Sequence, residues 1–578
     1  MELKRTTSER VDDLPLIIDW LSKMRIQNLL DQELPLPHGN RQGLSYGQLA
    51  VLLLTYILTQ ADHRLCAVES WVSQHRQTLE MATGWNIGDK DCSDDRLADL
   101  VSVLGSEEHE ALVTIETVLG QHLIRAYELP RDVARCDTSS FSVYHQSQPE
   151  NQQQGDHQQA PLLHKGHSKD YRPDLLQYRQ MLGTLDPGGM PLISATLTGN
   201  GADDPLYVPA WQRLVDIIGY PGFLYIADCK ASSWANRAQI DRGQGIYCFP
   251  VAMTGNRPDW LRDWVLDPPT PIQSIFLPTQ VLVEIPACEG FEMPLGSIWK
   301  QPDTKQWHYW SERWLVIRSA ALAQRQIQGL EKRLSNAELA LAKLARKPGN
   351  EPKVLQTQVD SLLTRYRVTE YFSVTIRQKI TYEKVYDGPG RPGANRPYRR
   401  VRQTVLILES QRLEPAITVA YTLAGWRMYV TNAPTEQLTL EQAVLYYREQ
   451  WQPEMGFHRF KRGALPALPI YFQDESRIRG LMFLLTIALR VFTLIEFVVR
   501  RQLRKQQESL AGLYDGNPKR STTRPTAERL LAAFGGITMY SHRDGSYEIS
   551  PLNPLQLQIL SLMGISSSLY TVPHLVPG

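Results

Sequence analysis

Four short apolar runs between residues 130 and 254 constrain the fold of this chain more than any other feature. They are rich in β-branched and aromatic residues and are bounded by turn-forming residues, which is the pattern of buried strands. The runs span residues 133–143, 192–197, 223–227 and 246–251. A helix is predicted among them, with Trp211, Leu214, Val215 and Ile218 at helical spacing. Strands mixed with helices predict an α/β sheet over residues 130–254.

The segments on either side of this sheet are predicted to be mainly helical. Residues 1–125 show apolar positions at helical spacing, and residues 436–505 do so again. The most apolar stretch, 480–499, is interrupted by Arg490 and Glu496. We therefore interpret it as a buried helix and expect no membrane span. Residues 506–578 are predicted to form a loop-rich tail with one short helix.

A long insertion, residues 255–430, separates the predicted sheet from the second helical part. Apolar residues at steps of three and four predict a helical hairpin over 316–366, broken at Pro348-Gly349-Asn350. Strand-like runs follow at 371–380 and 401–408. The insertion is therefore predicted to be β-rich and to carry a helical hairpin.

Composition narrows the class of protein. The chain has 578 residues with 62 basic and 61 acidic side chains, a net charge of +1, so any nucleic-acid surface must be a local patch. Its six cysteines are sparse and form no CxxC pair. The N-terminus shows no apolar signal region. These features favour a reducing compartment, and we expect a cytoplasmic protein.

Two aspartates follow apolar runs in the predicted sheet. Asp137 follows Val133–Cys136, and Asp228 follows Phe223–Ala227. Carboxylates placed on adjacent buried strands can converge on one divalent cation, and Mg²⁺ prefers oxygen ligands. The alternative interpretation is that each aspartate is a turn or helix cap, because Asp favours such positions.

A third polar group stands on the predicted helix that follows the insertion. Tyr447, Gln450, Glu454 and Lys461 are spaced by 3, 4 and 7 residues, which places them along one face of a continuous helix. Glu454 is the candidate metal ligand, and Tyr447 and Lys461 are candidate phosphate contacts. An ordinary amphipathic helix with a solvated Glu and Lys is the alternative.

Together these features resemble the DDE transposases of bacterial insertion sequences, in the branch with a YREK signature and a β-rich insertion before the glutamate. The signature Tyr-x2-Arg-x3-Glu-x6-Lys is matched at Tyr447, Glu454 and Lys461. Gln450 stands in the arginine position, and Pro453, expected to kink the helix, is a second departure. The segments GHSKDYRPDLLQ (166–177), GNGADD (199–204) and YIADCKASSW (225–234) add to the resemblance, which covers residues 10–540.

The resemblance implies an RNase H-like catalytic core, an α/β mixed sheet with helices, interrupted by the insertion. It implies catalytic and metal-binding roles for Asp137, Asp228 and Glu454, with two Mg²⁺ ions, replaceable by Mn²⁺. The implied reaction is cleavage at the ends of an insertion sequence, followed by transfer of the 3′-OH into target DNA. The implied partner is double-stranded DNA, namely terminal inverted repeats and target, bound by a homodimer in the bacterial nucleoid.

Further DNA contacts are expected outside the catalytic core. Residues 367–402 hold nine basic and three acidic side chains, a net charge of +6. Within the basic arm, residues 379–402, Gly390-Arg391-Pro392 resembles the core of an AT-hook, which enters the minor groove. The candidate DNA-binding residues are Arg391, Arg396, Arg399 and Arg400 in the arm, with Lys169 and Arg172 near the first aspartate. A solvated hairpin loop is the alternative for the arm, and residues 1–125 are expected to bind the terminal repeats.

Three other hypotheses stay open from sequence alone. One keeps the fold but not the activity, as a catalytically decayed transposase that only binds DNA. Another is a serine hydrolase, because Gly43-Leu44-Ser45-Tyr46-Gly47 matches GxSxG, although no strand is predicted before it and Ser45 is interpreted as a helix cap. The third is a helical scaffold that oligomerises through the heptad hairpin.

Overall fold

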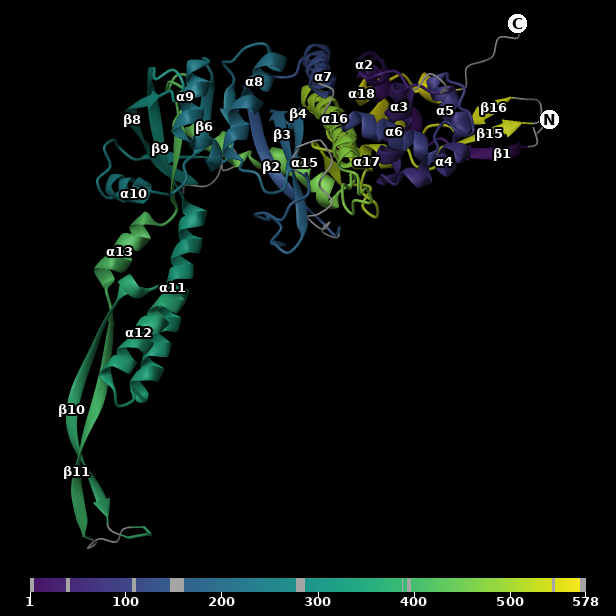
Figure 1. Cartoon of the computed structure of the whole chain (residues 1–578). Coiled ribbons are helices and arrows are strands. Elements are labelled where there is room, and N and C mark those ends of the chain that lie inside the picture. The colour runs from purple at the N-terminus through teal and green to yellow at the C-terminus, as the bar shows by residue number, and fades with distance from the viewer. Residues whose placement is uncertain are drawn as a thin grey trace. The chain divides into compact units, whose positions relative to one another are not determined.

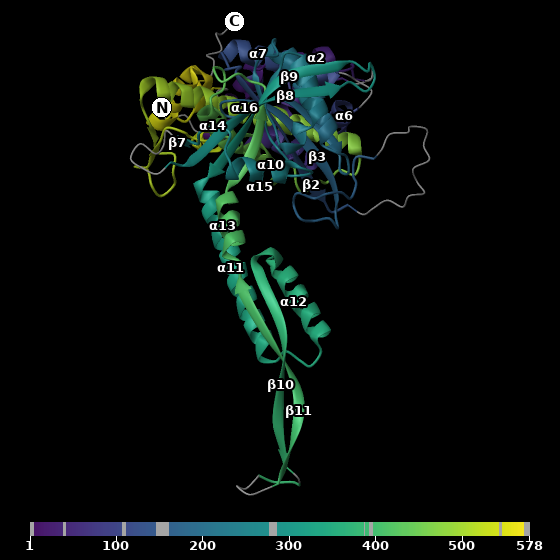
Figure 2. The ribbon, with the colours of Figure 1, turned by 90° about the vertical axis from the view of Figure 1, so that its left-hand side faces the viewer.

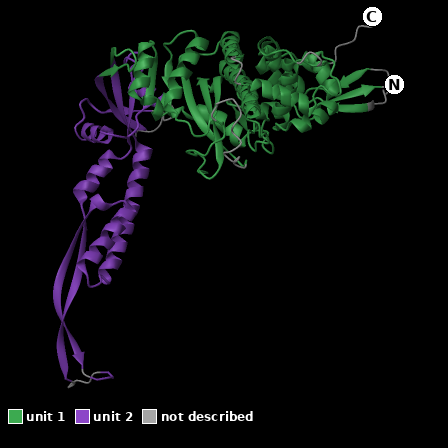
Figure 3. Cartoon of the chain, in the orientation of Figure 1, with its two compact units in different colours: residues 1–249, 297–310, 446–578 green, residues 250–296, 311–445 purple. Residues whose placement is uncertain are grey.

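The computed structural model of the chain describes residues 5–37, 42–106, 111–145, 161–276, 286–386, 388–391, 397–542 and 546–571. These residues form two compact units (Figure 3). Unit 1 comprises residues 1–249, 297–310 and 446–578, and unit 2 comprises residues 250–296 and 311–445. The chain thus leaves unit 1 twice, after residues 249 and 310, and returns to it each time. Unit 2 covers most of the insertion that the sequence predicts over 255–430.

The N-terminal part of unit 1 is helical, as predicted for residues 1–125, but it also contains a strand that the sequence did not predict. Its helices are α1 (Leu14–Lys23), α2 (Ile26–Glu33), α3 (Tyr46–Gln60), α4 (Leu65–Gln74), α5 (Arg76–Thr83), α6 (Asp94–Leu104) and α7 (Ala111–Tyr127). The strand β1 (Arg5–Arg10) pairs antiparallel with β15 (Thr538–His542), which also pairs with β16 (Tyr547–Ile549). The tail and the N-terminal region therefore share one small sheet.

The larger sheet of unit 1 is mixed. Five of its strands are β2 (Val133–Val143), β3 (Leu176–Leu185), β4 (Met190–Thr198), β5 (Leu224–Ile226) and β6 (Ile246–Pro250), and these five follow one another in the order β4-β3-β2-β5-β6. The first three strands are antiparallel neighbours, whereas β2, β5 and β6 run parallel. Helix α8 (Tyr207–Ile218) connects β4 to β5, and helix α9 (Trp234–Arg242) connects β5 to β6. The α/β sheet predicted over 130–254 is confirmed.

Helix α16 (Glu475–Gln506) is the central helix of unit 1. It is long and apolar enough to cross a membrane, but 89% of its most apolar stretch is buried inside the protein, as in a core helix. It crosses α6 at very close range. A Cβ atom added to Gly480 would lie only 1.9 Å from the carbonyl oxygen of Val101. Only glycine permits this approach. The remaining elements of unit 1 are α15 (Trp451–Arg462), β13 (Leu510–Ala511), β14 (Ser521–Thr522), α17 (Ala527–Ala532) and α18 (Pro554–Met563).

Unit 2 carries the predicted helical hairpin, formed by α11 (Ala320–Arg346) and α12 (Pro352–Tyr366). A long two-stranded ribbon, β10 (Phe372–Tyr386) and β11 (Tyr398–Arg412), runs beside this hairpin at its root and beyond it at its tip (Figures 1 and 2). The other elements are α10 (Arg257–Leu266), β7 (Gln273–Ile275), α13 (Glu414–Leu423) and β12 (Trp426–Thr431), together with β8 (Cys288–Lys300), β9 (Trp307–Ser319) and α14 (Leu440–Arg448), each of which also has residues in unit 1.

Candidate functional site

The two aspartates lie level with each other on neighbouring parallel strands of unit 1. In the register of β2 with β5, Arg135 pairs with Ile226. Two residues further along both strands stand Asp137 and Asp228, and Asp228 still has an extended backbone, with φ −73° and ψ 178°. Neighbouring strands are about 4.8 Å apart, and residues at the same level point to the same face. The fold thus brings the two carboxylates together, as the sequence predicts.

The strand predicted over 133–143 is confirmed, but Asp137 lies inside it and not at a strand end after the run Val133–Cys136. Strand β2 does not end at Cys136 but continues to Val143 along β3. Asp137 therefore lies in mid-strand, at the level where the parallel pairing with β5 has stopped. Because β5 ends first, one side of Asp137 is left open while its backbone stays fixed by β3.

Asp137 is a buried and charge-crowded carboxylate. Burial raises its pKa to about 6, and the negative charges of Asp228 and Glu454 add to the increase. The ammonium of Lys169 opposes this shift, as does the backbone N–H of Thr138, which donates to Asp137 Oδ1 at 2.8 Å. A carboxyl group with a perturbed pKa among like charges is typical of a functional site. Asp228 and Glu454, the other two acids predicted from the sequence, therefore both act electrostatically on Asp137.

Lys169 is held at this site by the strand that carries Asp137. Its ammonium donates to the hydroxyl oxygen of Thr138 at 3.0 Å and to the carbonyl oxygen of the same residue. Its backbone N–H donates to Ser140 Oγ at 2.9 Å. A cation fixed beside Asp137 is placed to attract a phosphate group.

Asp228 is oriented by two donors. The Tyr207 hydroxyl donates to Asp228 Oδ1 at 2.6 Å, and the backbone N–H of Lys230 donates to the same oxygen at 2.8 Å. Burial, together with the charge of Asp228, raises the pKa of Tyr207 far above its usual value, so Tyr207 remains a donor. The cap interpretation also holds here, because Asp228 caps the short 3-10 helix Cys229–Ser232. Its second oxygen, Oδ2, is the one placed for a further ligand.

Glu454 is exposed on the first turn of α15, which contacts β2. The prediction of one continuous helix through Tyr447 and Lys461 is wrong, because α14 ends at Arg448 and α15 begins at Trp451. Pro453 does not kink a helix interior. It lies in the first turn of α15, where its missing N–H has no intrahelical partner to lose. The sequence signature therefore spans a helix–helix junction.

Tyr447 and Lys461 consequently stand on separate helices. Tyr447 is near the end of α14 and is partly buried. Lys461 lies on the same face of α15 as Glu454, since seven residues make about two helical turns. Its ammonium pairs with Asp170 Oδ1 at 2.7 Å and lies 5.2 Å from the centre of the Phe141 ring on β2. Lys461 thus points toward the strand of Asp137.

The side chains of the three acids do not lie close enough together to bind one metal ion. Within the described ranges, no group of three His, Cys, Asp or Glu side chains is close enough to hold a metal ion. Their chemistry fits Mg²⁺, because carboxylate oxygens are the ligands that this ion prefers. The exposed side chain of Glu454 is the member with the most freedom to move.

Sequence reasoning missed a buried arginine beside the site. Arg135, fully buried on β2, donates from Nε and Nη2 to Asp186 at 2.7–2.9 Å. Its Nη1 donates to Gln450 Oε1 at 3.3 Å. Asp186 begins the β3–β4 turn, and Gln450 sits at the junction of α14 and α15. The residue in the arginine position of the signature is thus an acceptor for an arginine supplied by the sheet.

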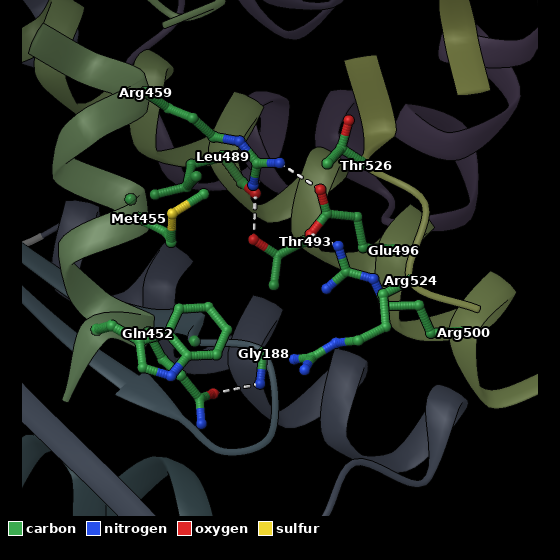
Figure 4. A pocket seen from close by; sticks show the side chains of 13 residues that line it. Gly188, Gln452, Met455, Arg459, Leu489, Thr493, Glu496, Arg500, Arg524 and Thr526 are labelled. Atoms are coloured by element: carbon green, nitrogen blue, oxygen red, sulfur yellow. Dashed lines mark hydrogen bonds and ion pairs between the residues drawn. The ribbon is translucent and has the colours of Figure 1, made fainter. Parts of the chain in front are cut away.

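The side of α15 opposite to Glu454 faces a pocket of about 150 Å³ (Figure 4). Arg459 pairs with Glu496 of α16 and, at 2.8 Å, with Glu528, while Arg500 reaches Glu496 at 3.0 Å. Gln452 accepts a hydrogen bond from the backbone N–H of Gly188 in the β3–β4 turn. These contacts hold α15 in place on the side opposite to Glu454.

The remaining candidate residues make none of the contacts described above. Arg172 is partly exposed and pairs with Asp174 at 2.8 Å. Arg391, Arg399 and Arg400 are exposed in unit 2, at the tip of the ribbon. Arg396 lies outside the described residues.

The hydrolase hypothesis for Ser45 is wrong as to local structure. Ser45 caps α3, with Gln48 N–H donating to Ser45 Oγ at 3.2 Å and Ser45 N–H donating to Gln48 Oε1 at 2.9 Å. The Ser45 hydroxyl itself donates to Asp31 at 2.9 Å. The residue is a structural cap and not a nucleophile elbow.

The chain matches no protein-family model, and no curated protein matches it.

Proposed function

We propose that the chain is a DNA transposase that cleaves DNA at the ends of an insertion sequence and joins the freed 3′-OH to target DNA. The observation that carries this proposal is the electrostatic coupling of Asp137 with Asp228 and Glu454 in one unit. The acids come from distant parts of the sequence, and Asp228 and Glu454 act on Asp137 because β5 and α15 both lie beside β2. The strand order β4-β3-β2-β5-β6, three antiparallel strands followed by two parallel ones, supports an RNase H-like core.

Each residue has a defined role in this proposal. Asp137, Asp228 and Glu454 hold Mg²⁺ ions, and Mn²⁺ is expected to replace them. Bound Mg²⁺ supplies activation of water and stabilisation of the leaving 3′ oxygen. Tyr207 fixes the orientation of Asp228. Lys169 and Lys461 bring positive charge to a DNA phosphate beside the carboxylates.

The same proposal includes the substrate, the oligomeric state and the cellular compartment. The substrate is double-stranded DNA, and two chains are expected to hold two DNA ends, so we propose a homodimer. All six cysteines are free, which suits the reducing interior of a bacterial cell. Arg172 and the arm residues Arg391, Arg396 and Arg400 are proposed DNA contacts outside the site.

The deciding experiment is metal-dependent nicking of a duplex that carries the DNA ends flanking the coding region. We expect nicks with 3′-OH ends in Mg²⁺ or Mn²⁺ and none in EDTA. Asp137→Ala, Asp228→Ala and Glu454→Ala should each abolish nicking. Asp216→Ala is the matched control, because it removes an exposed carboxylate of α8 that accepts a hydrogen bond from Gln212 Nε2, at 3.4 Å, within the same helix.

A second candidate function keeps DNA binding without catalysis. It is favoured by the finding that no three acidic side chains among the described residues reach metal-binding spacing. Wild-type protein that binds the duplex but nicks it with neither metal would support this decayed transposase over the enzyme.

A further inference from the structure

The β10–β11 ribbon of unit 2 has two different faces along its outer half. Its register pairs Phe372 with Arg412 at the root and Tyr386 with Tyr398 at the tip, without a shift. Directly opposite residues in an antiparallel pair point to the same face, and neighbours along a strand point to opposite faces. The side chains on each face can therefore be assigned from the register alone.

The root of the ribbon uses one of these faces for packing. Phe372, Leu406 and Leu408 are buried there against the helical hairpin of α11 and α12. Beyond the end of the hairpin the ribbon continues alone (Figures 1 and 2). The same face then changes from apolar to aromatic and basic.

We call this outer part the Tyr–Lys–Arg face. It consists of Tyr382, Lys384, Tyr386, Tyr398, Arg400 and Arg402. It therefore carries three tyrosines and three cations, and no acidic side chain is among these six residues. The opposite face over the same length consists of Thr381, Glu383, Val385, Arg399, Val401 and Gln403, with one acid and one base. The charge of the outer ribbon is thus concentrated on one side.

Five of the six members of the Tyr–Lys–Arg face are exposed, Tyr386 is partly exposed, and the side chains around Tyr398 contact one another. Tyr382 is 64% exposed and Tyr398 41% exposed. The Lys384 ammonium lies 4.4 Å from the centre of the Tyr398 ring, and the rings of Tyr386 and Tyr398 are 5.6 Å apart. The neighbouring Arg400 and Lys384 lower the pKa of Tyr398, which shows how positive this surface is. Exposed tyrosines here bury no core, so a packing role does not explain them.

We propose that the Tyr–Lys–Arg face binds duplex DNA, with Lys384, Arg400 and Arg402 on phosphates and the tyrosines against the groove wall. Charge complementarity selects a polyanion, because three cations stand together without an acid on that face. A two-stranded ribbon is narrow enough to enter the major groove, which is about 12 Å wide. The inference rests on the proposed DNA substrate. It also revises the sequence prediction for the arm, since Arg399 points away from Arg400.

The test compares two triple variants that remove the same charge from opposite faces of one ribbon. The face variant is Lys384→Gln/Arg400→Gln/Arg402→Gln. The control variant is Arg377→Gln/Lys379→Gln/Arg399→Gln, all three of which lie on the other face. Full-length proteins are titrated with a fluorescently labelled duplex at several salt concentrations. Thermal unfolding checks that both variants fold.

The face variant should bind more weakly, and its plot of log Kobs against log salt should be shallower by about 2.7, because each phosphate contact contributes about 0.9. The control variant should keep the wild-type slope. A third variant, Tyr382→Ala/Tyr398→Ala, should lose affinity without a change of slope, because it removes no charge.

Three outcomes would overturn the inference. Equal losses in both triple variants would indicate a general charge effect, and no loss in either would exclude the ribbon. Loss of binding to vesicles of anionic lipid, with DNA binding intact, would assign the face to a membrane surface. Nicking activity is measured separately. If nicking is normal and DNA binding does not depend on the ribbon, only this inference is refuted. If DNA binding depends on the ribbon but no nicking occurs, only the proposed enzymatic activity is refuted.

Discussion

The buried guanidinium of Arg135 donates to the side-chain oxygen of Gln450 across 3.3 Å, linking the strand of Asp137 to the junction that precedes Glu454. Arg135 also holds Asp186, so one side chain ties the sheet, the β3–β4 turn and the start of α15. Gln450 therefore has its own role in this chain, as the hydrogen-bond acceptor of Arg135, although it departs from the arginine of the signature.

Restoring the arginine of the signature should harm the protein. Gln450→Arg sets a second guanidinium against Arg135 and removes its acceptor, so we expect the free energy of unfolding to fall by about 1–2 kcal/mol. Nicking should fall with it. Chemical denaturation and the nicking assay measure both effects. Gln450→Glu, which keeps an acceptor, is the control, and a Gln450→Arg variant that is as stable as wild type and more active would contradict the role of Arg135.

The Tyr207 hydroxyl should tune metal binding through Asp228. Tyr207→Phe removes the 2.6 Å hydrogen bond while leaving the ring in place. Residues that orient a ligand typically change metal affinity by about 10–100-fold. We expect the Mg²⁺ concentration for half-maximal nicking to rise by about tenfold, with the rate at saturating Mg²⁺ less affected. An unchanged Mg²⁺ dependence would show that the backbone N–H of Lys230 orients Asp228 alone.

Asp13 should make stability depend on pH. Burial raises its pKa to about 7, and its usual value is 3.8, so the native state holds a proton there that the unfolded chain releases. Stability is then highest below the unfolded pKa and is lost as pH rises from about 4 to about 7. Asp13→Asn cannot ionise. The free energy of unfolding of Asp13→Asn should exceed that of wild type by an amount that grows across this range to about 2–4 kcal/mol and levels off above pH 7.

The measurement is the difference in unfolding free energy between Asp13→Asn and wild type, at several pH values between about 4 and 8. Taking the difference cancels other titrating groups. A constant difference across this range would show that Asp13 is not protonated in the native state.

Adding one methyl group at the crossing of α6 and α16 should lower the stability of the protein. Gly480→Ala places a Cβ atom 1.9 Å from the Val101 carbonyl oxygen, so the helices must separate. Overpacking of this kind costs about 1–3 kcal/mol. The control is Gly329→Ala on α11, where nothing lies within 4 Å of the added atom. It should be stabilising by about 0.5–1 kcal/mol, because Ala favours a helix over Gly. Thermal unfolding compares the two, and equal effects would contradict the close crossing.

Sequence patterns predicted the parts of the fold that depend on local periodicity. The apolar runs around Asp137 and Asp228 gave the core strands, and the heptad steps gave α11 and α12. The break between α14 and α15 was missed because residues 436–462 favour a helix locally throughout. Arg135 was missed because an arginine inside an apolar run shows no partner in sequence. The pairing of β1 with β15 joins residues more than 500 positions apart, so no local pattern could reveal it.

Unit 1 is completed only late in translation. Asp137 and Asp228 emerge from the ribosome long before Glu454, because the whole of unit 2 is made between Asp228 and Glu454. Strand β1 waits longer still, until β15 is synthesised. A nascent or prematurely terminated chain therefore lacks either the third acid or the sheet that joins its two ends. Under the function that we propose, such a chain cannot nick DNA, so unfinished copies leave the chromosome intact.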